Sequence, residues 1–168
     1  MHIILSPAKT MAGTSKIKAP AGTTPRFNQE AIEIALHMAQ YPAEELGRML
    51  KLSPKLMLES YHRFQNFHSA EEEPLQALLA YTGVVFKNIN PKDFTEADFR
   101  FAQDHLRLIS ICYGLLRPLD LIKPYRMEYA PYALFALRQL FRRELMKYFR
   151  PDNPGKGFPQ GLSCPAHL

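Results

Sequence analysis

Strand-like and helix-like patterns alternate along the first forty residues. Residues 2–6 form a short run of mostly apolar side chains, which is typical of a buried strand. Gly, Thr, Ser, Lys and Pro dominate residues 11–25, and this composition predicts a loop. Apolar side chains then recur at near-helical spacing over residues 27–40, which predicts a helix with one buried face. That face consists of Phe27, Ala31, Ala35 and Met38.

Two further helices are predicted next, joined by a tight turn. The first of them begins at Pro42. Ser53 is a favourable N-cap for the other helix, and Pro54 suits its first helical position. Helices joined this closely form a helical hairpin. The inward positions are Leu46, Met49 and Leu50 in the first helix and Met57, Tyr61 and Phe64 in the second.

The clearest helix start in the chain lies at Thr95. Thr95 can cap the helix, and Asp98 occupies the position of the acid in a capping box. Phe94 and Phe99 stand where a hydrophobic staple places its two apolar residues. The pattern predicts a helix that runs to about His105.

The remaining segments predict a mixed α/β domain. The run of acids before Pro74 breaks the helical pattern, and residues 78–81 fit a strand or a helix, an alternative that stays open. Strands separated by helices favour a small mixed sheet wrapped by helices. The other predicted segments are a buried strand at 106–113 ending at Gly114, a structured loop at 115–128, a basic amphipathic helix at 131–150, and a frayed tail at 151–168.

Composition narrows the class of protein. The chain has 168 residues and 46% hydrophobic content, enough for one domain with a core. It has no stretch of about 18 apolar residues that would span a membrane, and its start lacks the pattern of a secretory signal. The two cysteines, Cys112 and Cys164, are far apart, which favours the reducing cytoplasm. The net charge is +5, but residues 130–168 hold six basic against two acidic groups, so most of the excess lies in the tail.

The first candidate site follows the first predicted strand. Ser6 and Lys9 form a Ser-x-x-Lys pattern, yet the partner motifs that acyl transfer requires are absent. A lysine beside the hydroxyls of Ser6 and Thr10 at the carboxyl end of a strand favours anion binding. An ordinary solvated loop is the alternative.

The second candidate site is a charged cluster near the end of the predicted strands. Pro118 and Pro124 stiffen this segment and so reduce the entropy lost when its side chains are held in place. The arginine forks suit phosphate. An equal alternative is a network of ion pairs that braces an irregular loop. The cluster comprises Arg117, Asp120, Lys123, Tyr125, Arg126 and Glu128.

Metal binding is not predicted. Glu59 and His62 form one Glu-x-x-His pair, whereas a di-iron site needs two such pairs and further glutamates. Cys112 lies in an apolar strand and is interpreted as a packed thiol. The helical hairpin is similar to helix-hairpin-helix DNA binders, but it lacks their glycine, and Pro54 has no N–H for a phosphate. Simple helix packing is therefore favoured for it.

Three segments resemble the YaaA-type peroxide-stress protein family. They are ILSPAKTM, ADFRFAQDHLRLIS and YGLLRPLDLIKPYRME, and the resemblance covers residues 1–128. It implies a mixed sheet wrapped by helices, and a bacterial cytoplasmic protein that limits unincorporated iron during hydrogen peroxide stress. It also implies non-specific binding of double-stranded DNA through a positive cleft and a helix-hairpin-helix element, without a cofactor.

The resemblance also supplies site residues. Anion or DNA binding is assigned to the matched residues Ser6, Lys9, Thr10, Arg107, Arg117, Tyr125 and Arg126, with Asp120 and Glu128 as orienting carboxylates. Lys123 is added to this set from the charged cluster. Pro7 and Pro124 match the family pattern as well. We therefore expect the charged ends of Lys9, Arg117 and Arg126 to converge on one concave surface.

The resemblance ends at Glu128. Residues 1–128 are interpreted as the N-terminal part of a YaaA-type domain, 129–150 as a divergent basic helix and 151–168 as a disordered tail. A truncation, a frameshift or a replaced tail each account for this break, and each predicts impaired function. Two other functions stay open: an enzyme acting on a phosphate-bearing small molecule at the Lys/Arg site, and a non-functional fragment.

Overall fold

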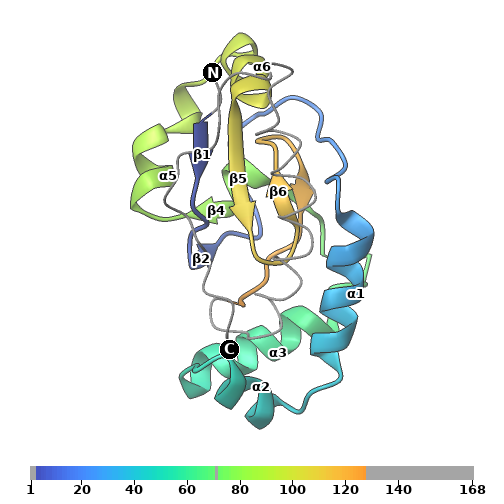
Figure 1. The fold of residues 1–168 in the computed structure, drawn as a ribbon. Helices are drawn as coiled ribbons and strands as arrows, with labels where there is room; N and C mark the ends of the chain where they lie inside the picture. The colour runs from blue at the N-terminus through green and yellow to red at the C-terminus, as the bar shows by residue number, and fades with distance from the viewer. Residues whose placement is uncertain (1–2, 71, 128–168) are drawn as a thin grey trace, which may run out of the picture.

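Three small sheets form the centre of the fold. The computed structural model describes residues 3–70 and 72–127. In the largest sheet the strand order is β1-β5-β6, with β1 parallel to β5 and β5 antiparallel to β6 (Figure 1). Two antiparallel pairs, β2 with β4 and β3 with β7, complete the strands of these residues. The strands are β1 (Ile3–Leu5), β2 (Thr10–Met11), β3 (Leu75–Gln76), β4 (Tyr81–Thr82), β5 (Leu106–Ser110), β6 (Gly114–Leu116) and β7 (Leu121–Ile122).

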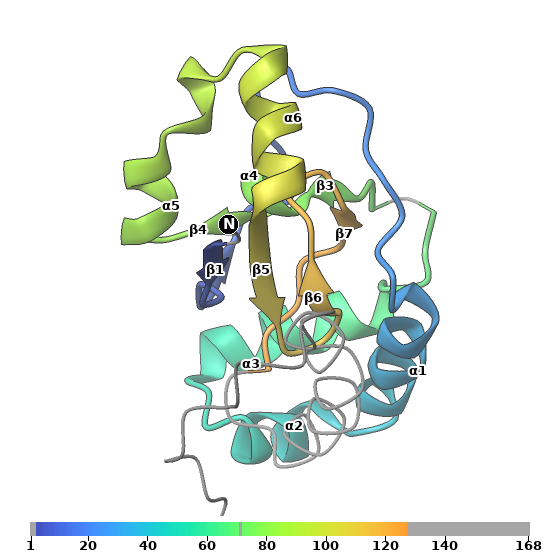
Figure 2. The ribbon, with the colours of Figure 1, turned by 45° about the horizontal axis from the view of Figure 1, so that its top comes forward.

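Helices lie at both ends of the largest sheet. Helix α6 leads into the amino-terminal end of β5, whereas α2 and α3 lie beyond its carboxyl end (Figures 1 and 2). The predicted mixed α/β class is therefore confirmed. The helices are α1 (Asn28–Ala39), α2 (Ala43–Met49), α3 (Pro54–Gln65), α4 (Ala77–Ala80), α5 (Val84–Ile89) and α6 (Glu96–His105), with a 3-10 turn η1 (Pro91–Asp93). Within residues 3–70 and 72–127, none of them has the length and apolar character needed to cross a membrane.

The first three helices follow the sequence pattern closely. The predicted inner face of α1 is buried, with Ala31 and Ala35 fully enclosed. Helices α2 and α3 form the predicted hairpin, in which Gly47 allows a close approach: an added Cβ would stand 2.7 Å from the side chain of Met57. Lys51 takes the left-handed conformation in the connecting turn, at φ 53°. Ser53 occupies the N-cap position and Pro54 begins α3, both as predicted, but the Ser53 side chain makes no capping hydrogen bond.

The predicted start of α6 is confirmed in detail. The Asp98 amide donates to Thr95 Oγ1 at 3.3 Å, and the Thr95 amide donates to Asp98 Oδ2 at 2.8 Å. Hydrogen bonds from the Thr95 hydroxyl and amide hold the pKa of Asp98 below its usual value. The rings of Phe94 and Phe99 lie 5.3 Å apart and close the staple. Two orphan donors of the helix are thus satisfied by neighbouring residues.

Three strand predictions need correction. Strand β1 forms, but Ile3 and Ile4 are 47% and 41% exposed rather than buried. The strand predicted to Tyr113 ends at Ser110, because the chain turns and reverses at Gly114, which adopts a φ of +73°. The predicted loop at 115–128 contains part of β6 and all of β7. The open alternative at 78–81 resolves into one helical turn followed by a short strand.

Helix α5 was not predicted, since its six residues are too few to show a periodic pattern. The helix predicted at 131–150 and the tail at 151–168 lie outside the described residues.

The capping box predicts a difference between two helix starts. Thr95→Ala removes the acceptor for the Asp98 amide and is expected to lower the free energy of unfolding by about 1 kcal/mol. Ser53→Ala is the matched control, because its side chain caps nothing and its loss should change stability little. Urea denaturation followed by circular dichroism measures both. Equal losses in the two variants would contradict the assignment.

Candidate functional site

The loop after β1 carries the first group of predicted site residues. Ser6, Lys9 and Thr10 are all exposed. Strand β2 begins at Thr10, whose hydroxyl donates to the carbonyl of Thr82, while the Thr82 hydroxyl donates to Thr10 Oγ1 at 2.9 Å. These bonds join the loop to β4. Lys9 is therefore held on a backbone fixed at both ends, by β1 before it and β2 after it.

Arg126 meets this loop from the far end of the described chain. Its guanidinium donates to the backbone carbonyl of Lys9 at 3.3 Å. A cavity of about 190 Å³ opens beside the two residues. Its lining consists of Pro7, Ala8, Lys9, Met11, Ile111, Tyr125, Arg126 and Met127. Two cations that are far apart in sequence thus border one concave surface, as expected for this pair.

Tyr125 lines the same cavity but directs its hydroxyl into the core. The hydroxyl lies 2.8 Å from Tyr81 Oη and 2.8 Å from Ser110 Oγ, and Ser110 Oγ also accepts from the Tyr113 amide. Burial raises the pKa of Tyr125 to about 12. The neutral hydroxyl therefore joins β4, β5 and the segment after β7 in one buried network.

Arg117 lies at the opposite end of the sheet. It follows Leu116, which pairs with Leu108 as β6 runs antiparallel toward the amino-terminal end of β5. Its guanidinium donates to the Asp120 carboxylate at 2.9 Å and to the Thr24 carbonyl at 3.4 Å. Lys9 instead borders the cavity with Ile111, beyond the carboxyl end of β5. The expectation that all three cations converge is therefore wrong for Arg117.

Asp120 is the centre of a buried network. The residue is 1% exposed. Its Oδ1 accepts from Thr23 Oγ1 at 2.6 Å and from the Arg117 guanidinium, and its Oδ2 accepts from the Arg117 amide at 2.8 Å. These contacts match the bracing alternative for this part of the cluster, because the carboxylate fixes the turn and the adjoining loop.

Two further predicted cations bind backbone carbonyls. Arg107 is buried and donates to the carbonyls of Gln103 and Leu106 at 2.8 and 2.7 Å, at the end of α6. Lys123 donates to the carbonyls of Phe67 and Ser69 at 2.9 and 2.6 Å. Both contacts stabilise chain turns. Glu128 lies outside the described residues.

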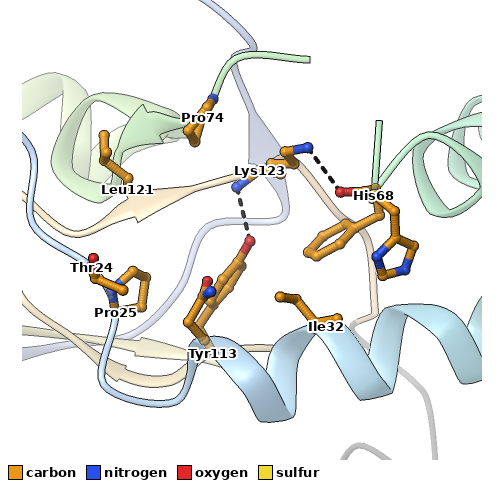
Figure 3. A pocket seen from close by; sticks show the side chains of 10 residues that line it. Thr24, Pro25, Ile32, His68, Pro74, Tyr113, Leu121 and Lys123 are labelled. Atoms are coloured by element: carbon orange, nitrogen blue, oxygen red, sulfur yellow. Dashed lines mark hydrogen bonds between the residues drawn. The ribbon is translucent and has the colours of Figure 1, made fainter. Parts of the chain in front are cut away.

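The structure also contains a larger cavity that sequence reasoning missed. It measures about 350 Å³ and lies between the start of α1, the segment after α3 and the β5–β6 turn (Figure 3). In Figure 3, the Tyr113 hydroxyl points to the backbone amide of Lys123, which donates to it at 3.0 Å. The residues come from four separate segments without a shared motif, so no local pattern could reveal them.

The remaining candidates have structural contacts. Glu59 forms an ion pair with Arg63 at 2.6 Å. Within residues 3–70 and 72–127, no group of three or more His, Cys, Asp or Glu side chains is arranged to hold a metal ion. Cys112 is fully buried, as predicted, and burial raises the pKa of its thiol.

Asp120→Asn tests the bracing network. The amide keeps the shape of the side chain but loses the charge that four hydrogen bonds stabilise, so stability is expected to fall by about 2–3 kcal/mol. The matched control is Glu96→Gln, which breaks an exposed ion pair with Arg100 and should change stability little. Urea denaturation compares the two variants, and similar midpoints would contradict the network's importance.

The hydroxyl network predicts a pH dependence. The pKa of Tyr125 is near 12 in the folded chain and about 10 in the unfolded chain. The neutral hydroxyl therefore stabilises the fold below pH 10, and this contribution is lost as the pH rises through 12. Tyr125→Phe should lower stability by about 1 kcal/mol at about pH 8. The gap between variant and unmodified chain should narrow by about 1 kcal/mol at about pH 11. A gap that widens with pH, measured by urea denaturation, would contradict the buried neutral hydroxyl.

Comparisons with known proteins support the family resemblance. A family model described as peroxide stress protein YaaA matches residues 1–153. A UPF0246 protein of Parabacteroides distasonis is 74% identical over 129 residues, which are 77% of this chain and 51% of the relative. A UPF0246 protein of Bacteroides thetaiotaomicron is 51% identical over 150 residues, 89% of this chain and 57% of the relative.

A more distant relative aligns over more of the chain. A UPF0246 protein of Rhizorhabdus wittichii is 38% identical over 168 residues, covering 98% of this chain and 66% of the relative. The chain spans about half the length of the first curated relatives that it matches. The boundary predicted at Glu128 stays a prediction. Because the family model matches most of the sequence, this chain belongs to the YaaA family of peroxide stress proteins.

Proposed function

We propose that this chain acts in the response to hydrogen peroxide, where it limits unincorporated iron and binds double-stranded DNA through the phosphate backbone. Family membership supports the role in peroxide stress. The names of the relatives say nothing of mechanism, so the DNA contact is argued from this chain's own residues. The proposal places the chain in the bacterial cytoplasm, where the DNA lies.

The observation that carries the DNA proposal is the pairing of Lys9 with Arg126 at one cavity. Arginine offers a planar fork and lysine a compact charge, and both suit phosphate oxygens. Lys9 is exposed and Arg126 is half-buried, and they meet beyond the carboxyl end of β1.

The α2–α3 hairpin supports a longer contact surface. It lies beyond the same end of the largest sheet (Figures 1 and 2) and carries exposed cations at Arg48, Lys51 and Lys55. The amides of Lys55 and Leu56 have no acceptor within α3, because they belong to its first turn. Since the Ser53 side chain does not cap the helix, these amides are suited to a backbone phosphate. Contacts of this kind position a protein on DNA without reading its sequence.

A salt titration tests the DNA contact. The affinity for a fluorescent duplex, followed by anisotropy, is expected to fall as salt rises, with a slope of roughly −0.9 per phosphate neutralised. The double variant Lys9→Ala/Arg126→Ala should bind more weakly and flatten this slope by up to about 1.8. Arg100→Ala is the matched control, since it removes an exposed cation from α6 at the other end of the sheet. A slope that is flat, or unchanged in the double variant, would reject binding at this cavity.

The same variants test the cellular role. In a bacterium without its own family member, the unmodified chain is expected to lower unincorporated iron, measured by electron paramagnetic resonance of chelator-treated cells, and to raise survival in hydrogen peroxide. The double variant should protect less than Arg100→Ala at equal protein levels. If the amount of unincorporated iron does not respond to the unmodified chain, the proposed role in limiting iron is rejected. If the double variant protects fully, protection does not depend on the DNA contact at Lys9 and Arg126.

A further inference from the structure

The larger cavity has the dimensions of a small-molecule site. Its volume of about 350 Å³ lies within the range usual for ligand pockets. Its lining residues come from α1 and the segment before it, the segment between α3 and β3, the β5–β6 turn, and β7 with the residue after it (Figure 3). The lining consists of Thr24, Pro25, Asn28, Ile32, Phe67, His68, Pro74, Tyr113, Leu121 and Lys123. None of these residues except Lys123 was predicted to belong to a site.

The walls of the cavity are mainly apolar and aromatic. Phe67 and Tyr113 are almost fully buried, and their rings lie 6.1 Å apart with a tilt of 34° between their planes. Ile32 and Pro25 extend this surface on the side of α1 (Figure 3). Flat apolar walls suit a planar ring better than a sugar, which needs a hydrogen-bond partner for each hydroxyl.

A few polar groups interrupt these walls. Within the described residues, no hydrogen bond joins the side-chain amide of Asn28 or the hydroxyl of Thr24 to another group. The Tyr113 oxygen accepts from the Lys123 amide, which leaves its own proton for an acceptor. Asn28 presents a donor and an acceptor side by side, the arrangement that pairs with the edge of a nucleobase.

Charge at the cavity favours an uncharged ligand. The Lys123 ammonium is directed to the carbonyls of Phe67 and Ser69. Burial raises the pKa of Tyr113, so its hydroxyl is neutral. A charged ligand would lose its hydration against the mainly apolar lining, which is unfavourable.

We propose that this cavity binds an uncharged, planar nitrogen heterocycle of nucleobase type, packed against Phe67 and Tyr113 with its polar edge on Asn28. A free nucleoside and an unpaired base in a single strand share this chemistry. Aromatic stacking with hydrogen bonds to the base edge is the usual way in which proteins hold unstacked bases. The site is separate from the proposed backbone contact at Lys9, because it reads a base edge and not a phosphate.

Nuclear magnetic resonance of the isotope-labelled chain tests the site with adenosine as probe. Adenosine is expected to shift the side-chain amide signals of Asn28 in a saturable manner. Asn28→Leu should weaken binding roughly tenfold, since it removes the paired donor and acceptor. Gln29→Leu is the matched control, because Gln29 is an exposed amide on the same helix, and should bind adenosine as the unmodified chain does.

A second titration with a single-stranded oligoadenylate identifies the source of the base. Binding that is tighter than that of adenosine and sensitive to Asn28→Leu indicates a strand, and equal or weaker binding indicates a free nucleoside. Unmoved Asn28 signals, or equal adenosine affinity in Asn28→Leu, would overturn the proposal. So would equally tight binding of indole, a planar ring without the paired edge. The salt slope on duplex DNA should be the same in Asn28→Leu, so failure here leaves the DNA proposal intact.

Discussion

The buried carboxylate of Asp120 is the constraint on which most of this architecture depends. An unpaired charge in the core would destabilise the fold severely, so its oxygens must be fully provided with donors. The donors come from Arg117 and Thr23, and Gln103 of α6 extends the network by bonding both Thr23 and the Leu119 amide. The backbone of the same turn accepts from the amides of Ala77 and Leu78. The turn around Asp120 thus joins the N-terminal loop, α4 and α6 directly before β7 begins.

The sequence predicted best those features that local chemistry controls. The start of α6 depends on Thr95 and Asp98, which are three residues apart, and the inner face of α1 depends on a periodic pattern. The exposure of Ile3 depends instead on what packs against β1, and the end of β5 depends on the reversal at Gly114. Neither can be read from neighbouring residues, because both arise from tertiary packing.

The candidate site could be predicted only in part for the same reason. The polar residues around Lys9 and around Arg117 were identified as two clusters, but the end of the sheet to which each belongs follows from the antiparallel return of β6. The sequence also does not show which cationic side chains are bound to backbone carbonyls within the fold. Arg107 and Lys123 bind carbonyls that helix ends and turns leave without partners. These contacts stabilise the fold, whereas Lys9 and Arg126 meet at one cavity and are the pair proposed to contact a ligand.

The two cavities share one buried wall. Tyr125 lines the cavity beside Lys9, and Tyr113 lines the larger cavity, with ring centres 6.1 Å apart. Ser110 connects them, because its hydroxyl oxygen accepts from the Tyr113 amide and lies within hydrogen-bond distance of the Tyr125 hydroxyl. Such a wall is rigid, since each polar atom in it has a partner and each ring is packed. This shared wall is therefore shaped before any ligand arrives, which reduces the entropy lost when a ligand packs against it.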